Sequence, residues 1–186
     1  MTEKTASVDA REVQRLRTET GAGVMDCKRA LEEARGDYEK ARDLLKQKGL
    51  AAAAKRAGRE AREGVVESYI HSGGRIGALV ELNSETDFVA ATAEFKDLAR
   101  NIAMQVAAMS PLVVSEEDLT QEARAELLKE HGGDEKKAIE ASVLLRQPYI
   151  RDNAKTVGDL VTALAQTTGE NVRVRRFARF QLGATA

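Results

Sequence analysis

Apolar residues in the first fifty positions recur at helical spacing in three short segments. Asp9 can cap a first helix, which stops at the glycine-containing turn of residues 20–23. A second helix is predicted from about residue 24 to 35, and a third ends at Gly49. The pattern therefore predicts a small three-helix module over residues 1–50.

A charged, alanine-rich stretch follows over residues 51–64. It has no apolar stripe that could form a core, and its basic residues outnumber its acidic ones. We interpret it as a partly helical linker with a mildly basic face. The basic residues are Lys55, Arg56, Arg59 and Arg62, against Glu60 and Glu63.

The pattern then changes to the two-residue period of strands. Residues 65–70 form one predicted strand, residues 72–75 a turn, and residues 76–82 a second strand. In the second strand the alternating residues Ile76, Ala78, Val80 and Leu82 mark one buried face. This pattern predicts an antiparallel hairpin.

The rest of the chain predicts helices and a final strand. The most regular helix covers roughly residues 92–109, and the tail from 172 to 182 has the composition of a strand. Three further helices have capping signals: Ser115 with Asp118 for a helix to about His131, Asp134 for one ending before Pro148, and Thr156 for one closed by Gly169. The fold class is α+β, with a core over residues 65–186 of about three antiparallel strands packed with helices.

Charge and cysteine content narrow the class of protein. Charged residues make up 32% of the chain but nearly cancel, giving a net charge of −1, so no overall field attracts nucleic acid or membrane. A single cysteine excludes a disulfide framework within one chain and suits a reducing compartment. The N-terminus lacks a secretory signal, and no apolar run reaches membrane-spanning length. We expect a cytoplasmic protein that binds no membrane.

Signatures of catalysis are missing from the sequence. There is no phosphate-binding glycine loop, and the two histidines, His71 and His131, are too far apart for a zinc motif. Cys27 lies on an apolar helix stripe and is expected to pack inertly in a core. We expect no enzyme, no metal site and no cofactor.

The segment Thr86-Asp87-Phe88-Val89 lies between the second strand and the long helix. It has two interpretations. In the first, Ser84 or Thr86 caps a turn and Phe88 packs on the sheet. In the second, Phe88 protrudes as an aromatic anchor for another protein, with the Asp87 carboxylate beside it. Spacing alone favours the first.

Two other segments carry open alternatives. Val24 and Met25, at a helix start after a glycine turn, either lie partly exposed or close the module's own core, and the pattern does not decide. In the tail, Arg173, Arg175, Phe177 and Arg179 would share one strand face, with Arg176 on the other. Such a face could bind RNA, but an exposed edge whose charges prevent aggregation is the commoner explanation, so no direct nucleic-acid binding is expected.

Two long motifs give the chain a resemblance to a known family. They are Leu16-Arg17-Thr18-Glu19-Thr20-Gly21-Ala22-Gly23-Val24-Met25-Asp26-Cys27-Lys28 and Glu81-Leu82-Asn83-Ser84-Glu85-Thr86-Asp87-Phe88-Val89-Ala90. With Gln147-Pro148-Tyr149-Ile150 and Thr168-Gly169-Glu170-Asn171-Val172 in the same order, the chain resembles bacterial elongation factor Ts over nearly its whole length.

The resemblance implies a guanine nucleotide exchange factor for elongation factor Tu. The front module would be similar to a ubiquitin-associated domain and would dock through Val24, Met25 and Lys28. Thr86, Asp87, Phe88 and Val89 would enter near the nucleotide site of the partner and dislodge the magnesium that helps to hold GDP. Binding of the factor and binding of GDP would then weaken each other.

The resemblance also implies an assembly. The chain has the length of the family's short form, in which two chains pair and form a two-to-two complex. No cysteine lies near the C-terminus, so this homodimer would be non-covalent. Val24 and Ser84 depart mildly from the commoner methionine and cysteine. The alternative hypothesis is a protein- or RNA-binding module with a ubiquitin-associated-like domain and no exchange activity.

Overall fold

The computed structural model describes residues 8–184, and the chain divides into two compact units. One unit contains the described residues up to Arg59 together with Thr162–Asn171. The other contains Glu60–Val161 and the described residues from Val172 onward. No helix among the described residues is both long and apolar enough to cross a membrane.

The first unit begins with a module of three helices, as the pattern predicts. Its helices are α1 (Ala10–Thr20), α2 (Val24–Glu33) and α3 (Tyr38–Arg56). Asp9 caps α1 by accepting a hydrogen bond from the backbone N–H of Arg11, and Gly21 ends α1 with a φ of 69°. The buried side chains form one small core: Val13, Leu16, Ala22, Cys27, Ala30, Leu31, Ala41 and Leu45.

The predicted end of the third helix at Gly49 is wrong, because α3 continues to Arg56. A glycine inside a helix costs only about 1 kcal/mol relative to alanine. The alanines at positions 51–54 have the highest helix propensity of any residue and offset that cost. Part of the sequence interpreted as linker is therefore the last turns of this helix.

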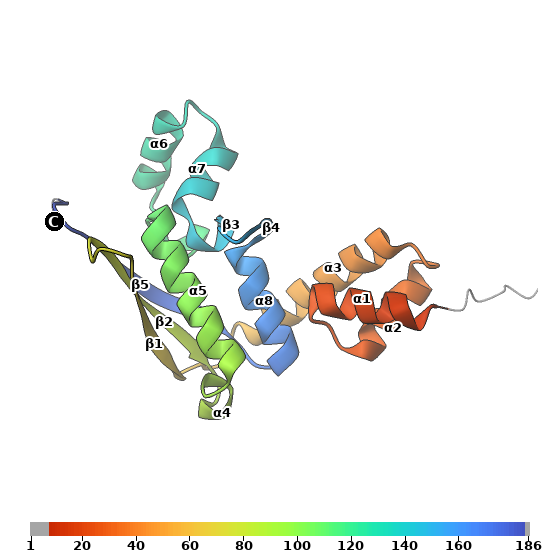
Figure 1. Cartoon of the computed structure of the whole chain (residues 1–186). Helices are drawn as coiled ribbons and strands as arrows, with labels where there is room; N and C mark the ends of the chain where they lie inside the picture. The colour runs from red at the N-terminus through yellow and green to blue at the C-terminus, as the bar shows by residue number, and fades with distance from the viewer. Residues whose placement is uncertain (1–7, 185–186) are drawn as a thin grey trace, which may run out of the picture. The chain divides into compact units, whose positions relative to one another are not determined.

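The second unit is built on a three-stranded antiparallel sheet in the order β1-β2-β5. The strands are β1 (Glu63–Ile70), β2 (Ile76–Ser84) and β5 (Arg173–Gln181). Helix α5 (Ala93–Met109) packs across one face, as Figure 1 shows, and buries Phe95, Leu98, Ala99 and Ile102 there. The hairpin, the long helix and the α+β class are confirmed.

A bulge in β5 overturns one prediction about the tail. Glu81 of β2 pairs with Arg176, whereas the next residue, Leu82, pairs with Val174. Arg175 is therefore an extra residue, and the side-chain alternation shifts by one at that point.

Because of this shift, Phe177 lies on the same face as Val174 and Val80, toward α5. Arg175 is exposed at the bulge, and the predicted common face of Arg173, Arg175, Phe177 and Arg179 does not exist.

The remaining elements connect α5 to β5. They are 3₁₀ helices at Glu116–Asp118 and Leu144–Arg146, helices α6 (Gln121–Glu130), α7 (Glu135–Ser142) and α8 (Val157–Thr168), and strands β3 (Pro148–Tyr149) and β4 (Asp152–Thr156).

Two expectations in this region need correction. The Ser115–Asp118 capping box forms, but it opens only a 3₁₀ turn, and the helix predicted to reach His131 begins separately at Gln121, with Thr120 as its N-cap. The small β3–β4 hairpin was not predicted, because Pro148 suggests only a break in structure.

Candidate partner-docking surfaces

Phe88 lies on a short helix that protrudes after the central strand. This helix is α4 (Asp87–Ala90), which follows β2 after two residues and lies next to the start of α5 in Figure 1. The Phe88 side chain is 82% exposed, and Asp87 beside it is exposed too. The favoured sequence interpretation, in which Phe88 packs on the sheet, is therefore wrong, although its capped turn is present.

Hydroxyl groups determine the course of the chain into α4. The buried Ser84 hydroxyl donates a hydrogen bond to the carbonyl oxygen of Thr86 at 2.9 Å. Thr86 is the N-cap of α4, and its Oγ1 accepts a hydrogen bond from the N–H of Val89 at 3.4 Å. Ala90 is buried and anchors the helix to the unit, while Asp87 in the first turn suits the positive end of the helix.

Val24 and Met25 form the second exposed apolar site. They begin α2 directly after Gly23 and are 46% and 62% exposed, so they do not close the core of the module. Cys27 points into that core and is fully buried, as predicted, and burial raises the pKa of its thiol. Lys28, one turn beyond Val24, pairs with Glu32 at 3.8 Å and remains about half exposed.

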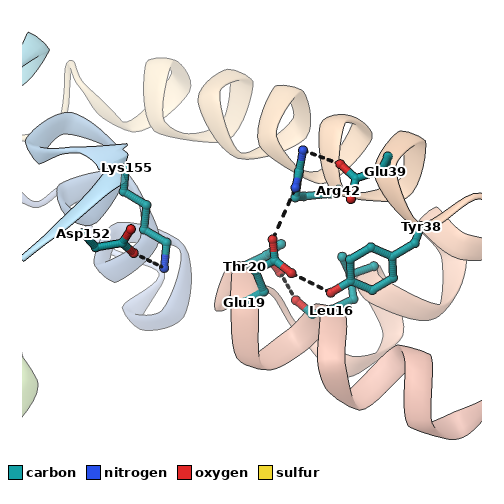
Figure 2. Close-up of polar contacts among 8 residues, drawn as sticks. All are labelled: Leu16, Glu19, Thr20, Tyr38, Glu39, Arg42, Asp152 and Lys155. Carbon is teal, nitrogen blue, oxygen red and sulfur yellow. Dashed lines mark hydrogen bonds and ion pairs between the residues drawn. The ribbon is translucent and has the colours of Figure 1, made fainter. Parts of the chain in front are cut away.

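Polar contacts between α1 and α3 hold this module together, as Figure 2 shows. Glu19 accepts a hydrogen bond from the Tyr38 hydroxyl at 2.7 Å and lies 3.5 Å from the Arg42 guanidinium. The hydrogen bond from Tyr38 is the main reason that the pKa of Glu19 is lowered. Burial first, and then the bond to Glu19, raise the pKa of Tyr38 to about 12. The end of α1, from which the chain turns toward Val24, is therefore held by contacts to α3.

The sheet face opposite α5 is a third apolar surface, which the sequence analysis missed. Val66, Ile70, Leu79 and Phe180 are between 44% and 69% exposed. Pairing of Ile70 with Gly77, and of Gly77 with Phe180, brings two of them to either side of a glycine. We call these four residues the outer sheet face. The sequence contained a signal for this face, because the first strand has apolar residues at consecutive positions, Val65-Val66 and Tyr69-Ile70, rather than at alternating ones.

Three of the four tail arginines bind their own unit. Arg176 pairs with Glu81 at 2.7 Å, and this hydrogen bond is the main cause of the lowered pKa of Glu81. Arg179 donates to the carbonyl oxygen of Ala107 at 3.1 Å, and Arg173 donates to that of Ala61 at 3.4 Å. These contacts give the arginines a structural role.

The described residues hold no group of three or more histidine, cysteine, aspartate or glutamate side chains placed to bind a metal ion. The described residues instead expose apolar side chains on short helices: Phe88 on α4, and Val24 and Met25 on α2. Such features are typical of a factor that acts by binding another protein.

Comparison with known proteins agrees with this class. Residues 49–132 match the family model described as Elongation factor TS. Elongation factor Ts of Carboxydothermus hydrogenoformans is 54% identical over 92% of this chain and 87% of its own length. The protein of that name from Caldanaerobacter subterraneus is 51% identical over 95% and 97%, and that from Syntrophobacter fumaroxidans is 48% identical over 97% and 99%. The chain belongs to the elongation factor Ts family of translation factors.

Proposed function

We propose that this protein is a guanine nucleotide exchange factor that binds elongation factor Tu in its GDP form and promotes release of GDP. The observation that carries the proposal is the exposure of Phe88 on a capped turn, with the Asp87 carboxylate beside it. A large exposed aromatic side chain on a fixed support is the kind of residue that anchors a protein interface.

The proposed action needs no covalent chemistry. Phe88 enters an apolar pocket near the nucleotide site of the partner, and Thr86 and Val89 complete the inserted segment. Asp87 brings a carboxylate toward the magnesium site, where oxygen ligands and their hydrogen bonds determine how the cation is held. Because magnesium supports GDP binding, its displacement couples binding of the factor to loss of GDP.

The front module supplies a separate docking surface in this proposal. Val24 and Met25 give exposed apolar contacts, and methionine adapts its shape to a partner surface. Lys28 lies on the same helix and adds a positive charge at the edge of the contact. These residues provide affinity, whereas the Phe88 segment provides the effect on GDP.

The test is the release of fluorescently labelled GDP from elongation factor Tu with catalytic amounts of this protein. The wild-type chain should accelerate release, and Phe88→Ala should slow it at least tenfold, the loss expected for an anchor residue worth about 1.4 kcal/mol or more. Leu112→Ala, which truncates another exposed apolar side chain, should release GDP like wild type. If the wild-type chain does not accelerate GDP release, the alternative of a non-catalytic binding module is favoured instead.

We further propose that two copies of the chain pair non-covalently through the outer sheet face, which would give a two-to-two complex with elongation factor Tu. Four large apolar side chains exposed together on one sheet face are unusual for a monomer. A second copy is the occupant that suits this face, since sheets of two chains can pack face to face in a symmetric, self-complementary interface.

Sedimentation equilibrium tests the pairing. The wild-type chain should show a concentration-dependent dimer, and Phe180→Glu should be monomeric because it places a charge in the apolar face. Leu112→Glu adds the same charge outside that face and should leave the dimer intact. A wild-type chain that stays monomeric at high concentration, or a Phe180→Glu chain that still pairs, would refute this interface.

A further inference from the structure

We infer that Thr92 is a positioning residue for Phe88: its hydroxyl ties the last turn of α4 to the first turn of α5. The inference rests on the proposed function, since it concerns how the Phe88 segment is held ready for a partner. Phe88 is the most exposed large apolar side chain among those described, so its own packing cannot fix its place.

The helix that carries Phe88 is also too short to be stable alone. Helix α4 has four residues, and isolated helices shorter than about 12 residues are marginal in water. Its geometry must therefore come from the elements on either side. At its N-terminal side, Ser84 and Thr86 supply the hydroxyl bonds described above.

At the C-terminal side a single side chain makes both connections. The Thr92 hydroxyl donates a hydrogen bond to the carbonyl oxygen of Val89 at 2.8 Å. The same oxygen atom of Thr92 accepts a hydrogen bond from the N–H of Phe95 at 3.3 Å, as the N-cap of α5. One hydroxyl can serve as donor and acceptor at once, so Thr92 links the two helices directly.

The support on the α5 side is rigid. Phe95 is fully buried, and α5 packs against β1 and β2 of the sheet. The backbone N–H of Thr92 also donates to the Val89 carbonyl oxygen, at 3.1 Å. Through Thr92 the end of α4 is thus held to a helix that packs against the sheet. An anchor held in this way loses less conformational entropy on binding, which favours the complex.

Three variants test the inference in the labelled-GDP release assay. Thr92→Val keeps the shape and removes both hydroxyl bonds, and it should slow release about fivefold, the factor that corresponds to a typical hydrogen bond. Thr92→Ser keeps the hydroxyl and should release GDP like wild type. Thr120→Val removes the equivalent N-cap of α6, where Thr120 accepts from the N–H of Ala123, and should also behave like wild type.

A double-mutant cycle separates positioning from general destabilisation. If Thr92 acts through Phe88, Thr92→Val should cause no further loss in a Phe88→Ala background. The inference is overturned if Thr92→Val releases GDP like wild type, or if it slows release equally in both backgrounds.

Hydrogen exchange of the free protein tests, without any partner, whether the Thr92 hydroxyl holds α4 in place. Thr92→Val should speed exchange at the amides of Ala90 and Ala91, which bond within α4, and Thr92→Ser should not. Unchanged exchange in Thr92→Val would overturn the inference. If the wild-type chain does not accelerate GDP release, the proposed function fails. Hydrogen exchange still shows whether the Thr92 hydroxyl holds α4 to α5.

Discussion

Gln105 and Gln147 are hydrogen-bonded to each other in the interior of the second unit, with 3.1 Å between Gln105 Nε2 and Gln147 Oε1. Both side chains are fully buried. Gln105 Nε2 also donates to the Pro148 carbonyl oxygen, and Gln105 Oε1 accepts from the N–H of Ile150 at 3.0 Å. This pair fastens the β3–β4 hairpin to α5.

Removal of one amide from this pair should be costly. Gln105→Met has a similar shape but leaves the Ile150 N–H and Gln147 Oε1 without their hydrogen-bond partner, while Gln147 Nε2 keeps its bonds to the carbonyl oxygens of Ala141 and Met109. We expect a loss of about 2 kcal/mol of unfolding free energy and faster hydrogen exchange at Ile150. Asn101→Ala on the same helix removes a solvent-exposed bond to Arg151 and should cost less than about 0.5 kcal/mol. Equal stability of the two variants would contradict the role of the buried pair.

Gly64 at the start of the sheet cannot carry a side chain. Its φ is 146°, and a Cβ atom there would lie 2.1 Å from the carbonyl oxygen of Leu82. We expect Gly64→Ala to destabilise the second unit by about 3 kcal/mol, combining backbone strain with overpacking. Gly58→Ala is the control, because nothing lies within 4 Å of a Cβ there. Denaturant midpoints from circular dichroism measure both, and an unchanged midpoint for Gly64→Ala would refute the expected clash.

The bond between Tyr38 and Glu19 should make the stability of the front module depend on pH. The pKa of Glu19 is lowered in the fold, so its contribution is present above its ordinary value of 4.5 and is lost as pH falls through the lowered pKa. The pKa of Tyr38 is raised to about 12, so its contribution is present below its ordinary value of 10.0 and is lost as pH rises toward 12. Both contributions to stability are therefore fully present between pH 4.5 and pH 10.0, the ordinary pKa values of the two groups.

Tyr38→Phe should therefore cost about 1 kcal/mol near neutral pH, and the difference from wild type should shrink in acid. Thermal unfolding of the module, followed by the NMR signals of Leu16 and Leu31 from pH 3 to 8, measures this. Tyr69→Phe, in the second unit, should leave these signals unchanged. A Tyr38→Phe protein with the same acid dependence as wild type would show that Glu19 gains nothing from the tyrosine.

The sequence was sufficient where the local pattern and the packing agree. The stripe of α5 and the alternation of β2 each place apolar residues on one face, and both elements are confirmed. The β5 bulge could not be predicted, because an extra residue such as Arg175 is defined only by the pairing of Glu81 and Leu82 opposite it.

The exposure of Phe88 could not be predicted from the sequence for a similar reason. The same residues suit a packed turn, and the sequence pattern does not show the hydrogen bonds of Ser84, Thr86 and Thr92 that accompany the exposed ring. The position of the segment in the sequence drew attention to it, but only the motif resemblance favoured the protruding interpretation. For Val24 and Met25, likewise, the pattern left burial undecided until the three helices were placed.

In the proposed function, Phe88 couples binding of the factor to loss of GDP, whereas the front module supplies affinity alone. The most direct test compares the affinity of each variant for nucleotide-free and for GDP-bound elongation factor Tu. Wild type should bind the nucleotide-free form more tightly, by a factor of about 5 to 150 or more, the usual range of coupling between two sites.

Met25→Ala should weaken binding to both forms and leave that ratio unchanged, while Phe88→Ala should bring the ratio close to one. A Phe88→Ala protein that keeps the wild-type ratio would show that Phe88 does not couple binding of the factor to loss of GDP.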